Sequence, residues 1–421
     1  MSDRQRVLVL GAGFAGLGAA RKLRKAPVDV LLVDRHDYHT FQPLLYQVAT
    51  DVLDPPTVGH PVRELVHHQD NLDFVQATVE TIDLDARTVA FADRDPEPYD
   101  HLVVGLGARV NFFGVEGAAE HSFPLYTLTD AVRLKTHVLQ LMEEAARHPD
   151  RVEPGSLDVV IVGGGPTGVE TAGAMAELLL TLFPGDYPDL DLSGLRITLV
   201  DHGSRLLAMF DEGLSAYTKK ALEERGVTVR LGEAVAGIAP DHVTLGTGEV
   251  IPAGTTVWGA GLQASPLAPM LSTELQHGRV PVDDHLRLPS HPEVFVAGDL
   301  AWIADGPDSS MALPQLGSVA LQAGEHAGRT IDRLTRKHKD PEPFHYVDKG
   351  TMATIGRRAA VAHMPPDLHL TGRAAFALWG AVHLALLTGG DSRMAAMVNW
   401  SWSFMSHDRP SRVIIDPNDE D

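Results

Sequence analysis

The sequence has 421 residues and no cysteine. The absence of cysteine excludes disulfides, thiolate zinc or iron–sulfur sites, and any dithiol redox centre. Basic residues are also scarce, because 35 Lys and Arg face 56 Asp and Glu, a formal net charge of −21. That charge repels phosphates, so we expect no nucleic-acid partner. The 21 histidines show no spacing typical of metal ligands, and no metal is predicted.

Long apolar runs are missing as well. The charge-free stretch 374–390 contains His383 and falls short of the roughly 20 apolar residues that a spanning helix needs. Residues 7–20 follow Arg4 and Arg6 in the manner of a signal peptide. The glycine spacing in 7–20 fits a nucleotide-binding turn better, so we expect neither a transmembrane helix nor a signal peptide.

The N-terminal segment has the pattern of a dinucleotide-binding unit. A buried strand at 6–10 precedes Gly11, Gly13 and Gly16, and a helix pattern begins directly after the second glycine. In such a turn the second glycine lets the backbone approach a pyrophosphate, and the third lets helix and strand pack closely. Asp34 ends the next strand, where a carboxylate accepts hydrogen bonds from ribose hydroxyls.

The same pattern occurs a second time. Gly163, Gly165 and Gly168 follow a strand at 158–162, and Asp201 ends the next strand. This second spacing from glycine to acid is longer, and the Pro-, Gly- and Asp-containing segment 180–194 reads as an inserted loop. A carboxylate at Asp201 favours NADH, since the additional phosphate of NADPH would meet like charge. Two such units predict two dinucleotides, FAD at the first and NADH at the second.

Four segments together resemble the type II NADH:quinone oxidoreductases, single-polypeptide respiratory enzymes that do not pump protons. These enzymes lie within the flavoprotein pyridine nucleotide-disulfide reductase superfamily. The segments are FQPLLYQVAT (41–50), GGGPTGVETAGAMAEL (163–178), VFVAGD (294–299) and DKGTMATIGRRAAVA (348–362). The resemblance implies that hydride passes from NADH to FAD and that electrons leave for a membrane quinone.

The resemblance assigns cofactor-binding roles to residues of this chain. Those expected at FAD are Gly11, Gly13, Phe14, Ala15, Gly16, Asp34, Arg35, Val79, Gly107, Ala108, Gly298, Asp299, Gln315 and Leu316. Those expected at NADH are Gly163, Gly165, Pro166, Thr167, Gly168, Asp201, Ala260 and Gly261.

Three residues are expected to act in catalysis. By resemblance, Glu170 handles protons near the nicotinamide, although an acid in a first helical turn also stabilises the helix dipole. The quinone motif A-Q-x-A-x-Q of the family corresponds to GSVALQ at 317–322, which keeps Gln322 but has Ser318 at the first glutamine. Lys349 matches the family lysine near the flavin and quinone, and its other interpretation is a surface loop lysine.

Two C-terminal apolar segments, 374–388 and 394–405, predict helices that lie on a membrane surface. Their tryptophans with flanking Arg393 and Arg409 have the composition of an interfacial helix, and a pair of core helices is the alternative. The expected location is the cytoplasmic face of the cell membrane, with a homodimer left open.

The predicted fold is α/β, with two Rossmann-like domains in a glutathione-reductase-like arrangement and a C-terminal region carrying the membrane helices. The expected limits are 1–112 and 265–340 for the FAD domain, 113–264 for the NADH domain, and 341–421 for the cover of the quinone site. Two other functions stay open: a soluble FAD-dependent NAD(P)H reductase of a protein acceptor such as ferredoxin, and a catalytically idle flavoprotein that senses redox state.

Overall fold

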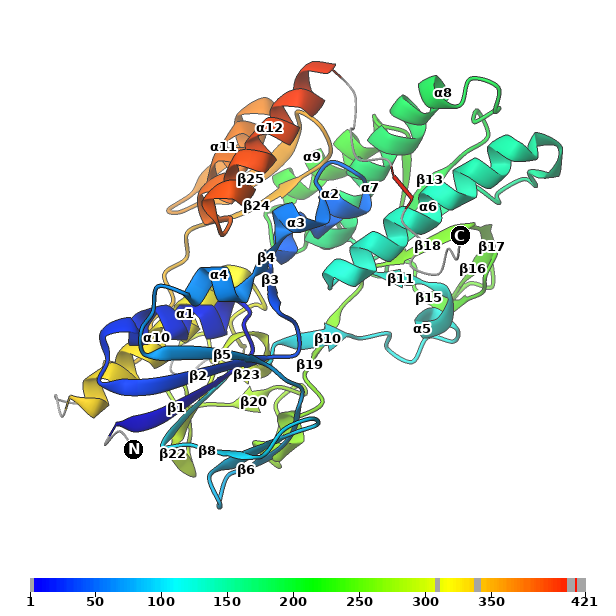
Figure 1. Ribbon diagram of the computed structural model, residues 1–421. Coiled ribbons are helices and arrows are strands. Elements are labelled where there is room, and N and C mark those ends of the chain that lie inside the picture. The colour runs from blue at the N-terminus through cyan, green and yellow to red at the C-terminus, as the bar shows by residue number, and fades with distance from the viewer. Residues whose placement is uncertain (1–3, 307–310, 337–341, 407–412, 415–421) are drawn as a thin grey trace. The chain divides into compact units, whose positions relative to one another are not determined.

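The computed structural model describes residues 4–306, 311–336, 342–406 and 413–414. The chain forms two units, each built from three separate segments (Figure 1). Unit 1 comprises Met1–His39, His60–Arg109 and Leu262–Asp348, and unit 2 comprises Thr40–Gly59, Val110–Gly261 and Lys349–Asp421. Residues 40–59 and the C-terminal region both belong to unit 2.

The core of unit 1 is a six-stranded sheet in the order β21-β22-β9-β1-β2-β5. All neighbouring pairs are parallel except β21 with β22. The strands are β1 (Gln5–Leu10), β2 (Val28–Asp34), β5 (Leu72–Gln76), β9 (His101–Val104), β21 (Arg287–Leu288) and β22 (His291–Val296). Side chains alternate along β1, with Leu8 and Leu10 in one apolar cluster and Val7 and Val9 in the other. Burial of both faces explains why β1 is a continuous apolar run.

Helices α1 (Phe14–Lys22) and α10 (Gly317–Thr335) pack against each other in unit 1 (Figure 1). Glycines permit the close approach: a Cβ on Gly324 would lie 1.9 Å from the carbonyl oxygen of Ala15. The other helices of unit 1 are η1 (Leu23–Lys25), α4 (Val62–Val66), η5 (Ala268–Met270) and η6 (Gly298–Leu300). Its smaller sheets contain β6 (Val79–Asp83), β7 (Thr88–Phe91), β8 (Glu97–Pro98), β20 (Val280–Pro281) and β23 (Ala301–Trp302).

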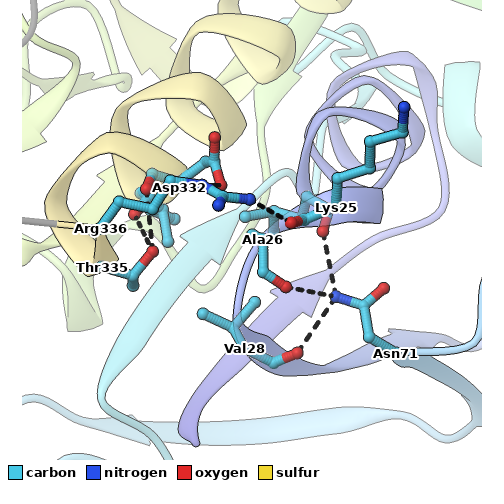
Figure 2. Close-up of polar contacts among 9 residues, drawn as sticks. Lys25, Ala26, Val28, Asn71, Asp332, Thr335 and Arg336 are labelled. Atoms are coloured by element: carbon cyan, nitrogen blue, oxygen red, sulfur yellow. Dashed lines mark hydrogen bonds and ion pairs between the residues drawn. The ribbon is translucent and has the colours of Figure 1, made fainter.

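Polar contacts hold the turn between α1 and β2 in place (Figure 2). The side-chain amide of Asn71 donates to the carbonyl oxygens of Leu23, Ala26 and Val28 at 3.0–3.3 Å. Arg336, just after α10, donates to the carbonyl of Lys25 and, at 2.7 Å, to the carboxylate of Asp332. The network therefore provides donors for carbonyls of η1, of the turn and of the start of β2.

Unit 2 contains a five-stranded parallel sheet in the order β11-β18-β12-β13-β14. Its strands are β11 (Phe123–Pro124), β12 (Val159–Val162), β13 (Ile197–Asp201), β14 (Val227–Leu231) and β18 (Thr255–Trp258). An antiparallel sheet contains β15 (Val235–Ile238), β16 (His242–Leu245) and β17 (Val250–Pro252). Four short strands lie where the chain passes between units: β3 (Tyr38–Thr40), β4 (Gly59–Pro61), β10 (Ala108–Val110) and β19 (Leu262–Ala264).

The helices of unit 2 come from all three of its segments. The first two segments supply η2 (Gln42–Leu44), α2 (Leu45–Ala49), α3 (Pro55–Val58), α5 (Ala118–His121), α6 (Leu128–Arg147), η3 (Pro149–Arg151), α7 (Pro166–Ala176), η4 (Glu177–Leu182), α8 (Phe183–Asp186) and α9 (Glu212–Glu223). The expected loop at 180–194 was partly wrong, since the helix continues as a π-helix, η4, and then as α8. Pro184 lies in the first turn of α8.

The C-terminal segment of unit 2 forms an antiparallel sheet followed by two helices. The sheet contains β24 (Thr351–Thr354), β25 (Ala360–Met364) and β26 (Leu368–Thr371). Helices α11 (Gly372–Leu386) and α12 (Gly390–Ser406) follow and contact each other (Figure 1). Within the described residues, none of the helices combines the length and apolar character needed to cross a membrane.

Candidate functional site

The first glycine turn connects β1 to α1 and has the geometry of a phosphate site. Gly11 has a φ of +97°, and a Cβ at Gly16 would lie 1.7 Å from the carbonyl oxygen of Gly11. A Cβ at Gly13 meets no atom within 4 Å, and no side chain caps the helix that starts there. The first and third glycines are therefore required by packing. The second faces open space beside exposed helix amides, which suits a pyrophosphate.

The acid that ends β2 is fixed against this turn. The Ala12 amide donates to Oδ2 of Asp34 at 2.6 Å, and the His36 amide donates to Oδ1 at 2.8 Å. The buried His39 ring lies 2.9 Å from the Ala12 carbonyl oxygen through Nδ1, and burial lowers its pKa to about 4. His39 is thus neutral near pH 7. The sequence patterns did not point to it, because its partner is a backbone carbonyl distant in sequence.

Other residues expected at FAD gather around the turn. A Cβ at Gly298 would lie 3.4 Å from the Cβ atoms of both Ala15 and Ala320. The Gln315 side chain donates to the Asp299 carbonyl at 3.1 Å, and Leu316 is the N-cap of α10. Gly107 lies in the turn before β10, which begins at Ala108. Phe14 begins α1, and Val79 packs against the apolar cluster that contains Ala15. Arg35 has an exposed side chain, and its carbonyl accepts from Gln76.

The second glycine turn, between β12 and α7, repeats the first nearly contact for contact. Gly163 has a φ of +114°, and a Cβ at Gly168 would lie 1.8 Å from the Gly163 carbonyl oxygen. A Cβ at Gly165 meets nothing within 4 Å. The Gly164 and Gly203 amides donate to Oδ2 and Oδ1 of Asp201 at 2.5 and 2.6 Å. The duplicated geometry supports two dinucleotide sites.

The other residues expected at NADH lie around this turn. Pro166 and Thr167 open α7, and the Thr167 carbonyl accepts from the Thr171 hydroxyl at 2.6 Å. A Cβ at Gly163 would come within 2.8 Å of the Ala260 Cα, so the loop after β18 closes on the turn. Gly261 belongs to the same loop and lies against the Phe113 ring.

Glu170 lies two residues beyond this turn, on α7, and is buried. Burial raises the pKa of its carboxyl to about 8, and the Thr354 amide, which donates to Oε1 at 3.2 Å, partly opposes the shift. The Thr354 hydroxyl lies 2.7 Å from the Tyr46 hydroxyl, and the Gln47 side chain donates to Tyr46 at 3.0 Å. A hydrogen-bonded group therefore leads from Glu170 to the first segment of unit 2.

This group borders a pocket of about 100 Å³ that lies entirely within unit 2. The lining is mostly apolar and aromatic and comprises Tyr46, Gln47, Val52, Ala174, Glu177, Thr354, Gly356, Arg357, Phe376, Trp379, Gly380, Trp400 and Ser403. The Trp400 indole donates to Gln47 at 2.7 Å. The Trp379 indole nitrogen is buried and has no acceptor among the described residues. A buried donor without an acceptor is costly, so the pocket suits a ligand that carries a carbonyl oxygen.

The other two residues expected in catalysis lie elsewhere. The side-chain amide of Gln322, on α10, makes two hydrogen bonds to the backbone of Val347. It donates to the Val347 carbonyl and accepts from the Val347 amide, each at 3.0 Å. Ser318 contacts the Tyr346 hydroxyl at 3.0 Å. Lys349 is exposed at the start of the last segment of unit 2. The structure therefore gives Gln322 a clear role in holding the chain before Lys349.

The two C-terminal helices expose apolar side chains mainly on α12. They are Leu386, Met394, Met397, Val398, Trp402 and Met405, between 43% and 71% exposed. The α12 members recur at intervals of three and four residues and so follow one helix face. Trp379, on α11, does not lie on this surface, since it is 2% exposed and its ring stacks on His383 with the ring centroids 4.4 Å apart.

This pair of dinucleotide turns on parallel sheets defines an oxidoreductase fold with two nucleotide-binding units. The family model for pyridine nucleotide-disulphide oxidoreductases matches residues 5–324. A type II NADH:quinone oxidoreductase of Mycobacterium tuberculosis is 35% identical over 98% of this chain and 90% of its own length. One from Staphylococcus aureus is 31% identical over 89% and 92%. The structure of NDH2 from Plasmodium falciparum, in complex with NADH, superposes with a TM-score of 0.89 at 19% identity, covering 97% of this chain and 99% of that one.

The chain therefore belongs to the pyridine nucleotide-disulphide oxidoreductase family and, within it, to the type II NADH:quinone oxidoreductases. The predicted fold class and family resemblance are confirmed.

Proposed function

We propose that the two units divide the work of an NADH:quinone oxidoreductase, with FAD held by unit 1 and the nicotinamide and quinone sites in unit 2. The chain is an FAD-dependent enzyme that oxidises NADH and reduces a quinone. The observation that carries the division is the duplicated turn, with Gly13 and Gly165 both facing open space at an uncapped helix start.

The residues of unit 1 fit FAD. The open space at Gly13 admits the pyrophosphate against the amides of Phe14 and Ala15, and Asp34 is placed for a ribose. When bound, FAD accepts hydride from NADH and passes electrons on to the quinone. The protein supplies position and charge: Asp299 and the start of α10 lie beside the turn, where helix amides stabilise negative charge.

The quinone headgroup is assigned to the aromatic pocket of unit 2. Its carbonyl oxygens are acceptors, and the pocket offers the Trp379 indole and the Tyr46 hydroxyl as donors. Reduction of a quinone to a quinol consumes two protons. Glu170, whose carboxyl accepts from the amide of the pocket residue Thr354, is the candidate donor for one of them. Gln322 and Lys349 remain candidates for the same half-reaction, as the family resemblance predicts.

Glu170 is expected to give the quinone half-reaction a pH dependence. Since its pKa is about 8, the carboxyl holds a proton below pH 8 and loses it above, so reoxidation by quinone should slow as pH rises through 8. Glu170→Gln should remove this pH dependence and slow reoxidation at least about tenfold. Tyr46→Phe, which deletes one hydroxyl, should slow it about two- to tenfold.

The measurement is rapid mixing, with the two half-reactions recorded separately from the flavin spectrum. Both variants should be reduced by NADH at close to the wild-type rate. Gln322→Ala serves as the comparison at the other candidate position. If only Gln322→Ala slows reoxidation, the headgroup does not bind in the pocket.

Cofactor preference follows from Asp201. Both of its oxygens accept hydrogen bonds from backbone amides, which fix the orientation of the carboxylate. Its negative charge therefore stays in place and repels the 2′-phosphate of NADPH. We expect kcat/KM for NADH to exceed that for NADPH at least about tenfold, or about 1.4 kcal/mol. Steady-state rates with a water-soluble quinone check this, and equal values for the two donors would contradict it.

Membrane association is proposed through α12 and the end of α11. A quinone dissolved in lipid reaches the pocket most directly if Phe376, Trp379 and Trp400, which line it from these helices, lie near the membrane surface. We place the chain on the cytoplasmic face, where NADH is available. A homodimer remains a prediction from the family.

A further inference from the structure

A cluster of imidazoles and carboxylates in unit 2 lies apart from the nucleotide turns and the quinone pocket. His363 on β25 and His369 on β26 are directly opposed in an antiparallel pair, so their side chains share a face. Their rings are 4.7 Å apart and nearly perpendicular. Asp367 lies in the turn between these strands, and its Oδ1 is 3.3 Å from Nε2 of His369.

From this cluster we propose a site for a divalent transition-metal ion such as Zn²⁺, with His363, His369 and Asp367 as ligands. One ligand atom from each residue lies within 4.8 Å of the others. Tetrahedral zinc with bonds of about 2.0–2.2 Å sets its ligand atoms roughly 3.3–3.6 Å apart. The pair Asp367–His369 already meets this spacing, so a small side-chain adjustment of His363 completes it.

A second carboxylate, that of Asp211, lies close to the other ring nitrogen of His369. Asp211 is the N-cap of α9, and its Oδ1 accepts from the Gly213 and Leu214 amides at 2.8 and 3.0 Å. Its Oδ2 is shielded from solvent, accepts no hydrogen bond from the described residues, and lies 3.4 Å from Nδ1 of His369. A metal-binding histidine commonly gives its second ring N–H to a carboxylate, which fixes the ring and strengthens the ligand. Asp211 is therefore the positioning residue.

The donor set selects the metal class. Two imidazoles and one carboxylate suit Zn²⁺, Ni²⁺ or Co²⁺. They do not suit Mg²⁺ or Ca²⁺, which take oxygen ligands. Asp367 and His369 are exposed enough for an ion to enter, at 84% and 36% of their side chains. The three ligands leave a fourth position for water.

A bound ion would tie the β25–β26 turn to the start of α9 through His369 and Asp211. Since β26 runs directly into α11, the ion would also fix the beginning of the helix that lines the quinone pocket. The sequence showed no metal motif, because the ligand spacing of four and two residues has meaning only once the strands are paired.

Calorimetric titration of the untagged, flavin-loaded protein with Zn²⁺ tests the site, with excess Mg²⁺ present throughout. We expect one equivalent to bind to the wild type. His363→Gln and Asp367→Asn should each weaken binding at least tenfold. Asp211→Asn, which keeps the helix cap, should also weaken it about tenfold or more.

The matched control is His67→Gln with His68→Gln, an adjacent histidine pair outside the cluster, which should leave the affinity unchanged. Flavin content and NADH oxidation, measured for every variant, should stay at wild-type level. If His363→Gln and Asp367→Asn bind Zn²⁺ as tightly as the wild type, these side chains interact only with one another and do not bind the metal, and the proposal fails.

Discussion

Replacing Gly13 with valine should give a folded protein that purifies without flavin. A Cβ at this position meets no atom of the neighbouring described residues within 4 Å, so we expect the fold to tolerate the side chain. The same side chain occupies the space that the pyrophosphate needs next to the helix amides. We expect bound FAD to fall at least about 100-fold, measured as flavin released per protein after purification.

Gly16→Val is the matched comparison. A Cβ there would lie 1.7 Å from the Gly11 carbonyl oxygen, so β1 and α1 would have to separate. We expect unit 1 of this variant to fold poorly, so that the protein has a lowered melting temperature or is insoluble. A Gly13→Val protein that retains full flavin would contradict the assignment of FAD to this turn.

Replacing Leu386, Val398 and Trp402 together with glutamine should release the protein from lipid vesicles. These residues are 52%, 56% and 50% exposed, so the fold does not depend on burying them. If each buries apolar area worth about 1 kcal/mol in the lipid interface, partitioning falls on the order of 100-fold. Activity with a water-soluble quinone should be retained, and activity with a quinone in the vesicles should fall.

The control removes a similar apolar area elsewhere in unit 2. Met209, Val250 and Leu368 are 46%, 53% and 52% exposed and lie outside α11 and α12. Their replacement by glutamine should leave vesicle binding at the wild-type level. Equal loss of binding in the two triple variants would show that α12 has no special part in it.

Both glycine turns could be predicted from the sequence because each is a local device. Strand, glycines, helix and acid follow one another within a short stretch. The contact that requires the third glycine of each turn comes from the first glycine, which is close to it in the sequence. The pocket proposed for the quinone could not be predicted this way. Tyr46 comes from the first segment of unit 2, whereas Thr354 and Trp379 come from the last, and only the folded chain brings them together. The segments 41–50 and 348–362, which contain Tyr46 and Thr354, were noticed for their family resemblance, but neither residue was given a role.

Trp379 shows a second limit of sequence patterns. The run 374–388 is apolar nearly all round, so its periodicity does not reveal which face is buried. The structure buries Trp379 and His383 and leaves Leu386 exposed. The buried face accommodates a histidine because His383 is neutral and hydrogen-bonded. Its Nδ1 lies 2.8 Å from the Trp379 carbonyl oxygen, and burial lowers its pKa to about 4.

The anchoring of Asp201 by the Gly164 amide has a consequence for attempts to redesign the donor specificity. Exchanging this acid for a neutral or basic residue would admit a 2′-phosphate, and it would also leave the Gly164 amide without its acceptor. The turn that cradles the dinucleotide would then loosen for NADH and NADPH alike. Specificity and affinity are therefore coupled at this carboxylate. A successful exchange would need asparagine or serine, which keep an acceptor for the amide, together with a new cation placed further along the loop.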